Sequence, residues 1–175
     1  MISIYKKPLP LAAVSTFLFL NVFLTACGVY SFTGASIPPE AKTISIQQFP
    51  NNAPLVQPML SQLFTDALRD KFSSQTSLTQ VAANGDLSFE GAITDYRTQP
   101  VAITGDQTAA LNRLTITIRV VFRNRFDEKQ NFESTFTRFD DYDSSRALAE
   151  VEEQLMADII EALVQDVFNR SVVNW

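Results

Sequence analysis

The chain has 175 residues, no histidine, a single cysteine and a formal net charge of −5 at pH 7. Without histidine it lacks the commonest general base, the commonest metal ligand and every nucleophile arrangement that relies on an imidazole. The acidic balance argues against nucleic acid as a partner. A lone cysteine allows no intrachain disulfide, so the fold must be stabilised by packing, for which 14 phenylalanines are available.

The first 26 residues have the layout of a secretory signal peptide. Lys6 and Lys7 supply the positive start, and residues 9–24 form an uncharged apolar run that is too short to span a bilayer comfortably. We therefore assign residues 1–26 to a cleaved signal peptide and leave them out of the fold prediction.

The apolar run ends in the sequence LTAC at residues 24–27, which resembles the lipobox of a bacterial lipoprotein. This resemblance implies cleavage after Ala26 and acylation of Cys27, which would leave no free thiol. Gly28 stands where aspartate would retain a lipoprotein in the inner membrane, so the implied destination is the outer membrane. The alternative hypotheses are an ordinary signal peptide, a buried core cysteine and a membrane-spanning anchor.

Residues 28–40, GVYSFTGASIPPE, show neither helical nor strand periodicity and end in two prolines. We interpret residues 27–41 as a lipidated tether and residues 42–175 as a single domain. Tyr30 and Phe32 are expected either to lie at the level of the lipid headgroups or to fold back onto the domain.

Alternation at residues 42–49 predicts a half-buried first strand, and the prolines and asparagines of residues 50–54 predict a loop. A helix is predicted from about Pro58, where proline is tolerated in the first turn, to about residue 73. The predicted buried stripe of this helix consists of Met59, Leu60, Leu63, Phe64, Ala67, Leu68 and Phe72.

The middle of the chain predicts further strands. Residues 78–82 form either a short strand or the approach to the next one, and residues 87–94 alternate with one apolar face. Gly91 within that strand indicates a bulge or a close approach of backbone. The long connection at residues 97–110 is compatible with a binding loop and with a slack hairpin loop.

Residues 111–126 are the clearest predicted strand, because apolar and polar side chains alternate along them. After a polar turn, residues 132–142 return as a partner strand, with Phe132 and Phe136 inward and the register beyond Arg138 left open. The predicted core face of the first strand consists of Leu114, Ile116, Ile118, Val120, Phe122 and Phe126. The predicted opposite face consists of Arg113, Thr115, Thr117, Arg119, Arg123 and Arg125.

The last predicted element is a helix capped by Asp143, Ser144 or Ser145, with an apolar stripe from Leu148 to Leu163. The resulting order predicts an α+β fold of two layers. We expect a mixed, mostly antiparallel four-stranded sheet with both helices packed on one face, in the order β-α-β-β-β-α.

Two surface features could carry chemistry. The Arg/Thr face of residues 111–126 offers planar cations suited to phosphates or carboxylates, but cross-strand pairing with Glu90 or Glu133 would make it an ordinary solvated face. The acidic run at residues 139–145 offers oxygen ligands to calcium, although it lacks the glycine and distal glutamate of an EF-hand and helix capping also explains it. No pattern indicates catalysis or a cofactor.

The lipobox, the segment CGVYSFTGASIP, the following TISIQQFPN strand and the order of elements together resemble the LptE-type lipopolysaccharide-assembly lipoproteins of the Gram-negative outer membrane. The resemblance covers nearly the whole chain after the signal peptide. It implies a non-catalytic plug and assembly subunit of a large β-barrel translocon, an LptD-like protein, that delivers lipopolysaccharide to the outer leaflet. The domain would face the periplasm or the barrel lumen.

By this resemblance, the Arg/Thr face would contact lipid A phosphate or the barrel lumen. The transfer is made by face and not by a matched motif, and the acidic balance of the chain is a departure that weakens ligand binding more than plugging. One alternative is a scaffold or accessory lipoprotein of another envelope secretion, transport or cell-wall machine. Another is an enzyme that uses Asp140, Asp141 or Asp143 with a metal.

Overall fold

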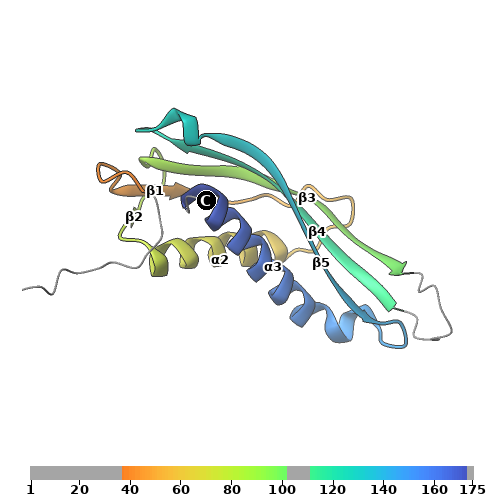
Figure 1. Ribbon diagram of the computed structural model, residues 1–175. Helices are drawn as coiled ribbons and strands as arrows, with labels where there is room; N and C mark the ends of the chain where they lie inside the picture. The colour runs from red at the N-terminus through yellow and green to blue at the C-terminus, as the bar shows by residue number, and fades with distance from the viewer. Residues whose placement is uncertain (1–36, 102–110, 173–175) are drawn as a thin grey trace, which may run out of the picture. The chain divides into compact units, whose positions relative to one another are not determined.

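The computed structural model describes residues 37–101 and 111–172 (Figure 1). The predictions for the signal peptide, for Cys27 and for most of the tether lie outside these residues. The predicted order of elements is confirmed, and residues 78–82 contain a short strand. The elements are β1 (Thr43–Ile46), α2 (Leu60–Gln75), β2 (Thr79–Gln80), β3 (Leu87–Val101), β4 (Leu111–Asn124), the 3-10 turn η2 (Glu128–Gln130), β5 (Phe132–Asp143) and α3 (Leu148–Val172).

The strands form one mixed sheet in the order β2-β1-β3-β4-β5. β1 runs parallel to both of its neighbours, whereas β3, β4 and β5 are antiparallel to one another. The predicted α+β class is therefore confirmed. The sheet has five strands where four were expected, because the two residues of β2 pair with the outer edge of β1.

β3 is longer than the sequence suggested. It pairs with β4 from Leu87 opposite Asn124 to Val101 opposite Leu111, so residues 97–101 belong to the strand and not to the connection. These residues are mostly polar and exposed, and only the pairing with β4 reveals them as strand. The register shifts between Ile93 and Asp95, two residues after Gly91.

Gly91 instead marks the close backbone approach that was the other expectation. A Cβ atom at this position would lie 2.1 Å from the carbonyl oxygen of Arg119 and 2.5 Å from the Cε1 atom of Phe49. Only glycine fits this contact without a shift of the neighbouring strand.

Both helices lie on one face of the sheet (Figure 1). Aromatic contacts join the two layers: Phe72 of α2 lies 5.0 Å from Phe89 of β3 and 5.1 Å from Phe168 of α3, measured between ring centroids. Phe89 in turn lies 4.8 Å from Phe122 of β4. Each such buried side chain contributes roughly 1.5–3 kcal/mol, so this aromatic group is a major part of the core.

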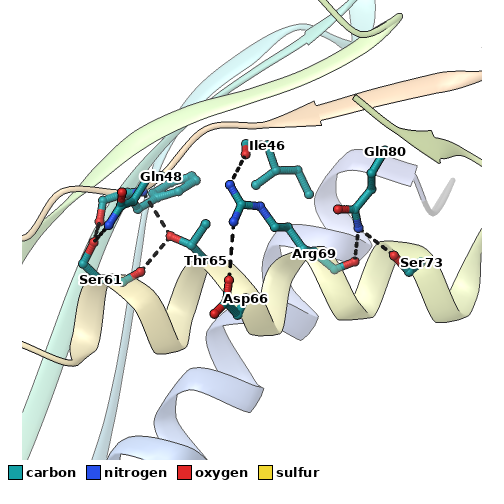
Figure 2. A network of polar contacts seen from close by, with 9 residues as sticks. Ile46, Gln48, Ser61, Thr65, Asp66, Arg69, Ser73 and Gln80 are labelled. Atoms are coloured by element: carbon teal, nitrogen blue, oxygen red, sulfur yellow. Dashed lines mark hydrogen bonds and ion pairs between the residues drawn. The ribbon is translucent and has the colours of Figure 1, made fainter. Parts of the chain in front are cut away.

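Polar contacts hold α2 against the end of β1 and the segment that follows it, as Figure 2 shows. The Phe49 N–H donates to the buried hydroxyl of Thr65 at 3.1 Å, and the Ser61 hydroxyl donates to the Phe49 carbonyl oxygen at 2.6 Å. Arg69 donates from Nη2 to the carbonyl oxygen of Ile46 at 2.9 Å. Backbone groups that the sheet does not pair are thereby satisfied by α2, as buried polar groups must be.

The final helix begins later than the sequence indicated. β5 continues to Asp143, whose Oδ1 accepts from the Ser145 N–H at 2.8 Å in the turn that follows, and α3 begins only at Leu148. The expected cap residues therefore stabilise the turn and not the helix end. Among residues 37–101 and 111–172, no helix is long and apolar enough to cross a membrane.

Candidate functional site

The sheet presents one face to the helices and leaves the other free of them. The buried β4 side chains on the helix side are Leu114, Ile116, Ile118, Val120 and Phe122. Successive side chains of a strand point to opposite faces, so Arg113, Thr115, Thr117, Arg119 and Arg123 lie on the other side. We call this side, with the facing residues of β3 and β5, the open face.

Arg113 is held in place by β5. Its Nε and Nη2 donate to the two carboxylate oxygens of Asp141 at 2.7 and 2.8 Å, and its guanidinium lies 3.6 Å from the ring centroid of Phe139. The hydrogen bonds from Arg113 lower the pKa of Asp141, and the same bonds raise the pKa of Arg113. Asp141 thus takes two of the five N–H donors of Arg113 and neutralises its charge, so this arginine is less available to another anion.

The two threonines of the predicted site contribute to the sheet more than to its surface. Thr115 is 4% exposed and lies between Arg97 and Phe139, its register partners on β3 and β5. The Thr117 hydroxyl shares a hydrogen bond of 3.0 Å with the Thr137 hydroxyl across β4 and β5. A ligand on the open face would therefore meet the neighbouring arginines before it met Thr115.

Arg119 forms the cross-strand pair that the sequence offered as the alternative. Its Nε lies 3.4 Å from the Glu133 Oε1, and the two side chains are 55% and 59% exposed. A pair so open to solvent is weak and exchanges readily. Glu90, the other expected partner, instead accepts from the Gln47 side chain at 3.2 Å.

Arg123 and Arg125 lie near the β4–β5 turn and line a hollow of about 350 Å³. Arg123 is exposed and forms no ion pair with any residue that the structure describes. Arg125 lies beyond the end of β4, contrary to the predicted strand, and its N–H donates to the Asp86 carbonyl oxygen at 3.0 Å. Phe126, predicted to point inward, is exposed for the same reason.

Asp86, which lines the same hollow, is already engaged. Its Oδ2 accepts from the Lys42 N–H at 2.9 Å and from the Thr43 N–H and hydroxyl at 3.0 and 2.9 Å. The Lys42 bond is the largest cause of a lowered Asp86 pKa, with the Thr43 hydroxyl next and the charge of Arg125 contributing least. Glu128 also lines this hollow, so Arg123 and Arg125 share it with two acidic residues, of which Asp86 is already engaged by hydrogen bonds.

Sequence reasoning missed the residues that neutralise the open face. Asp141 and Phe139 were not assigned to it because the register beyond Arg138 was open, although the alternation of β5 continues to Asp143. Arg97 and Asp95 of β3 form a further ion pair there. The open face therefore carries both signs of charge and is not uniformly basic.

The acidic residues that suggested calcium have other partners. Asp141 binds Arg113, the Asp140 Oδ1 accepts from the Asp141 N–H at 2.8 Å, and Asp143 holds the following turn. Across residues 37–101 and 111–172, no group of three or more Asp, Glu or Cys side chains is arranged to hold a metal ion.

A family model described as lipopolysaccharide-assembly, LptE, matches residues 41–171. No curated protein matches the chain. Similar solved structures include the hypothetical protein CT253 from Chlamydia trachomatis, with 8% identity, 77% of this chain and 99% of that chain covered, and a TM-score of 0.50. A minor lipoprotein from Acinetobacter baumannii is 15% identical, with 74% of this chain and 91% of that chain covered and a TM-score of 0.49. Rare lipoprotein B from Shewanella oneidensis is 15% identical, with 74% of this chain and 90% of that chain covered and a TM-score of 0.42.

At such identities the CT253 likeness bears on the fold alone, and none of these structures assigns a function. The family match is the stronger finding, because it includes all five strands, all of α2 and all but the last residue of α3. The chain therefore belongs to the LptE family of lipopolysaccharide-assembly lipoproteins.

Proposed function

We propose that this chain is an outer-membrane lipoprotein, anchored through acylated Cys27, and the plug and assembly subunit of an LptD-like β-barrel that delivers lipopolysaccharide to the outer leaflet. Membership of the lipopolysaccharide-assembly family over residues 41–171 carries the proposal. The family is one of non-enzymatic assembly lipoproteins, and the role asks for binding and not for catalysis.

The proposed anchor depends on the sequence LTAC at residues 24–27. A single acyl chain gives only marginal membrane binding, so a diacylated and further acylated Cys27 is the form that would hold the domain at the bilayer. The domain begins its described structure at Ile37, shortly after the anchor. It would therefore stay close to the membrane surface, facing the periplasm or a barrel lumen.

The composition of the open face supports the plug role. Arg113–Asp141, Arg119–Glu133 and Arg97–Asp95 are three ion pairs on that face. The interior of a large outer-membrane barrel is polar and hydrated, so a face of mixed charges fits it better than an apolar face would.

Contact with lipopolysaccharide is proposed to depend chiefly on the β4–β5 end of the open face. Arg123 and Arg125 border a hollow there, and a phosphate group accepts two parallel hydrogen bonds from a guanidinium. Arg119 can join them because its exposed pair with Glu133 is weak. Arg113 is the least available of the predicted arginines, because Asp141 occupies two of its donors.

The test is a mild-detergent pull-down of the tagged, lipidated full-length protein from outer membranes, with co-purifying proteins identified by mass. A large β-barrel protein recovered in equal amount is the expected result. Recovery without such a barrel, or with inner-membrane machinery, would contradict the plug role and favour an accessory lipoprotein of another envelope machine. A Cys27→Ser variant, expected to leave the membrane fraction, tests the anchor separately.

A further inference from the structure

A groove runs between the two helices on the side of the molecule that the proposed function leaves unused. Its volume is about 910 Å³, and every residue that lines it belongs to α2, to α3 or to the segment before α2. The helices are joined near their C-terminal ends, where the Lys71 Nζ donates to the Gln165 side chain at 2.7 Å. The residues that line the groove follow α2 as far as Ser74 and α3 from Ala149 to Val164, so the groove extends along both helices.

The floor of the groove is apolar and partly exposed. Met59 and Leu63 were predicted to be buried, but they are 54% and 40% exposed. Met156 and Ile160 of α3 also line the groove, and both are largely buried. Single exposed apolar side chains are ordinary, whereas a continuous group of them within a hollow is typical of a binding surface.

Methionine is concentrated in this groove. The chain has three methionines, and the two that follow the initiator, Met59 and Met156, both line it. A methionine side chain is flexible and polarisable, so it adapts to partners of different shape. An apolar groove with a methionine on each wall is therefore suited to receiving side chains from another protein.

The rim of the groove is acidic. Asp70, Glu152, Glu153 and Glu161 line it, and the only cation among the lining residues is Lys71. Lys71 donates to the Gln165 side chain and lies 5.4 Å from the Phe168 ring. Acidic residues therefore outnumber cations along the groove, and complementary charge would favour a cationic partner.

We infer that the α2–α3 groove binds a cationic amphipathic helix of a partner protein. Such a helix repeats its apolar side chains at every third or fourth position, and these would enter between Met59, Leu63 and Met156. Lysines or arginines that flank its apolar stripe would face Glu153 and Glu161. The site lies in the helix layer, away from the open face, and does not depend on lipopolysaccharide or on a barrel.

The inference is tested with the full-length lipidated protein in nanodiscs of zwitterionic phosphatidylcholine, with empty nanodiscs as the blank. The probe is a fluorescein-labelled peptide of about 18 residues, or about five helical turns, with a leucine stripe flanked by lysines. One comparison peptide has every lysine replaced by glutamate, and another has the same composition in scrambled order. Anisotropy titration should show saturable binding of the lysine peptide, at least tenfold tighter than either comparison.

Two groove variants test the floor and the rim. Leu63→Gln alters an exposed side chain and should weaken binding about fivefold while leaving the thermal unfolding unchanged. The double variant E153K/E161K should bind the lysine peptide at least tenfold more weakly than the original protein and should bind the glutamate peptide more tightly. The matched control, E150K/D158K, makes the same charge change on α3 outside the groove and should stay within twofold of the original protein.

Three outcomes would overturn the inference: no saturable binding of the lysine peptide, equal binding of the glutamate peptide, or an equal loss in the control variant. Sedimentation provides a further check. If the protein self-associates, Leu63→Gln abolishes the association and the lysine peptide does not bind, the occupant is a second copy of this chain and the inferred partner is wrong.

Discussion

Arg113 of β4 and Asp141 of β5 form a two-point ion pair across the sheet, Nε to Oδ1 at 2.7 Å and Nη2 to Oδ2 at 2.8 Å. The pair joins the β4–β5 ladder far from the turn that connects these strands. Replacing Asp141 with Asn removes the charge and should lower Tm by about 1–4 °C at pH 7. Circular dichroism melting checks this, with Asp70→Asn as the control because Asp70 is exposed and forms no ion pair with a described residue.

The same pair predicts how stability responds to acid. The Arg113 hydrogen bonds hold the pKa of Asp141 below its ordinary value of 3.8, so the pair stabilises the fold while the carboxylate is ionised. The difference in Tm between the original protein and Asp141→Asn should be constant above about pH 5 and should close as the pH falls below 3.8. A difference that persists unchanged at about pH 2 would show that the effect is not ionic.

Charge reversal at Arg123 and Arg125 should weaken lipopolysaccharide binding more than any other double change on the open face. Both arginines border the same hollow, and neither is held in an ion pair with a described residue. Binding of purified lipopolysaccharide to the full-length protein should fall at least tenfold in R123E/R125E. The control R146E/R170E makes the same change in net charge on the helix side, and its lipopolysaccharide binding should stay within twofold of the original protein. An equal loss of binding in both variants would show that overall charge, and not this site, is responsible.

Gly91→Ala should destabilise the fold because the added methyl group clashes with the neighbouring strand. The added methyl group would lie 2.1 Å from the Arg119 carbonyl oxygen on the paired strand, which cannot move without disturbing the ladder. We expect a loss of about 1–3 kcal/mol in the free energy of unfolding, measured by urea denaturation. Ala92→Ser, which adds one atom on the open face beside it, should change that free energy far less, and an equal loss would argue against the clash.

Much of the fold could be predicted because periodicity is a local property. The alternation of residues 111–126 identified both the buried β4 side chains and the arginines opposite them. Residues 97–101 were missed because they are mostly polar, show no alternation and are strand only through their pairing with β4. Met59 and Leu63 belong to the predicted apolar stripe but are exposed, because whether such a stripe is covered depends on tertiary packing and not on local periodicity.

The sequence predicted which residues form the candidate site, but not which of them are engaged in ion pairs. The sequence places four arginines in the order of the strand, but it does not show which of them meets an acid on the next strand. Asp141 meets Arg113 because the register of β5 on β4 places the two residues opposite each other. Ion pairing across a sheet is a tertiary property, so local alternation could not supply it.

Tyr96 and Glu152 link β3 to the start of α3. Tyr96 is 2% exposed, and its hydroxyl donates to the Glu152 Oε1. Tyr96→Phe keeps the ring and removes this bond, so it should lower the free energy of unfolding by about 0.5–1.5 kcal/mol at pH 7, measured by urea denaturation.

The response of this pair to alkali follows from burial. Burial raises the pKa of Tyr96 above its ordinary value of 10.0, and the hydrogen bond to Glu152 adds to the shift. The contribution of Tyr96 to the free energy of unfolding is therefore complete below pH 10.0 and declines above it. Above that pH the unfolded chain can release a proton that the folded chain retains. The Tyr96→Phe variant has no such proton. The difference in free energy of unfolding between it and the original protein should therefore be smaller when urea denaturation is repeated at about pH 11. Tyr142→Phe serves as the control for loss of a tyrosine hydroxyl, and a Tyr96→Phe deficit that is the same at both pH values would refute the buried, protonated state of Tyr96.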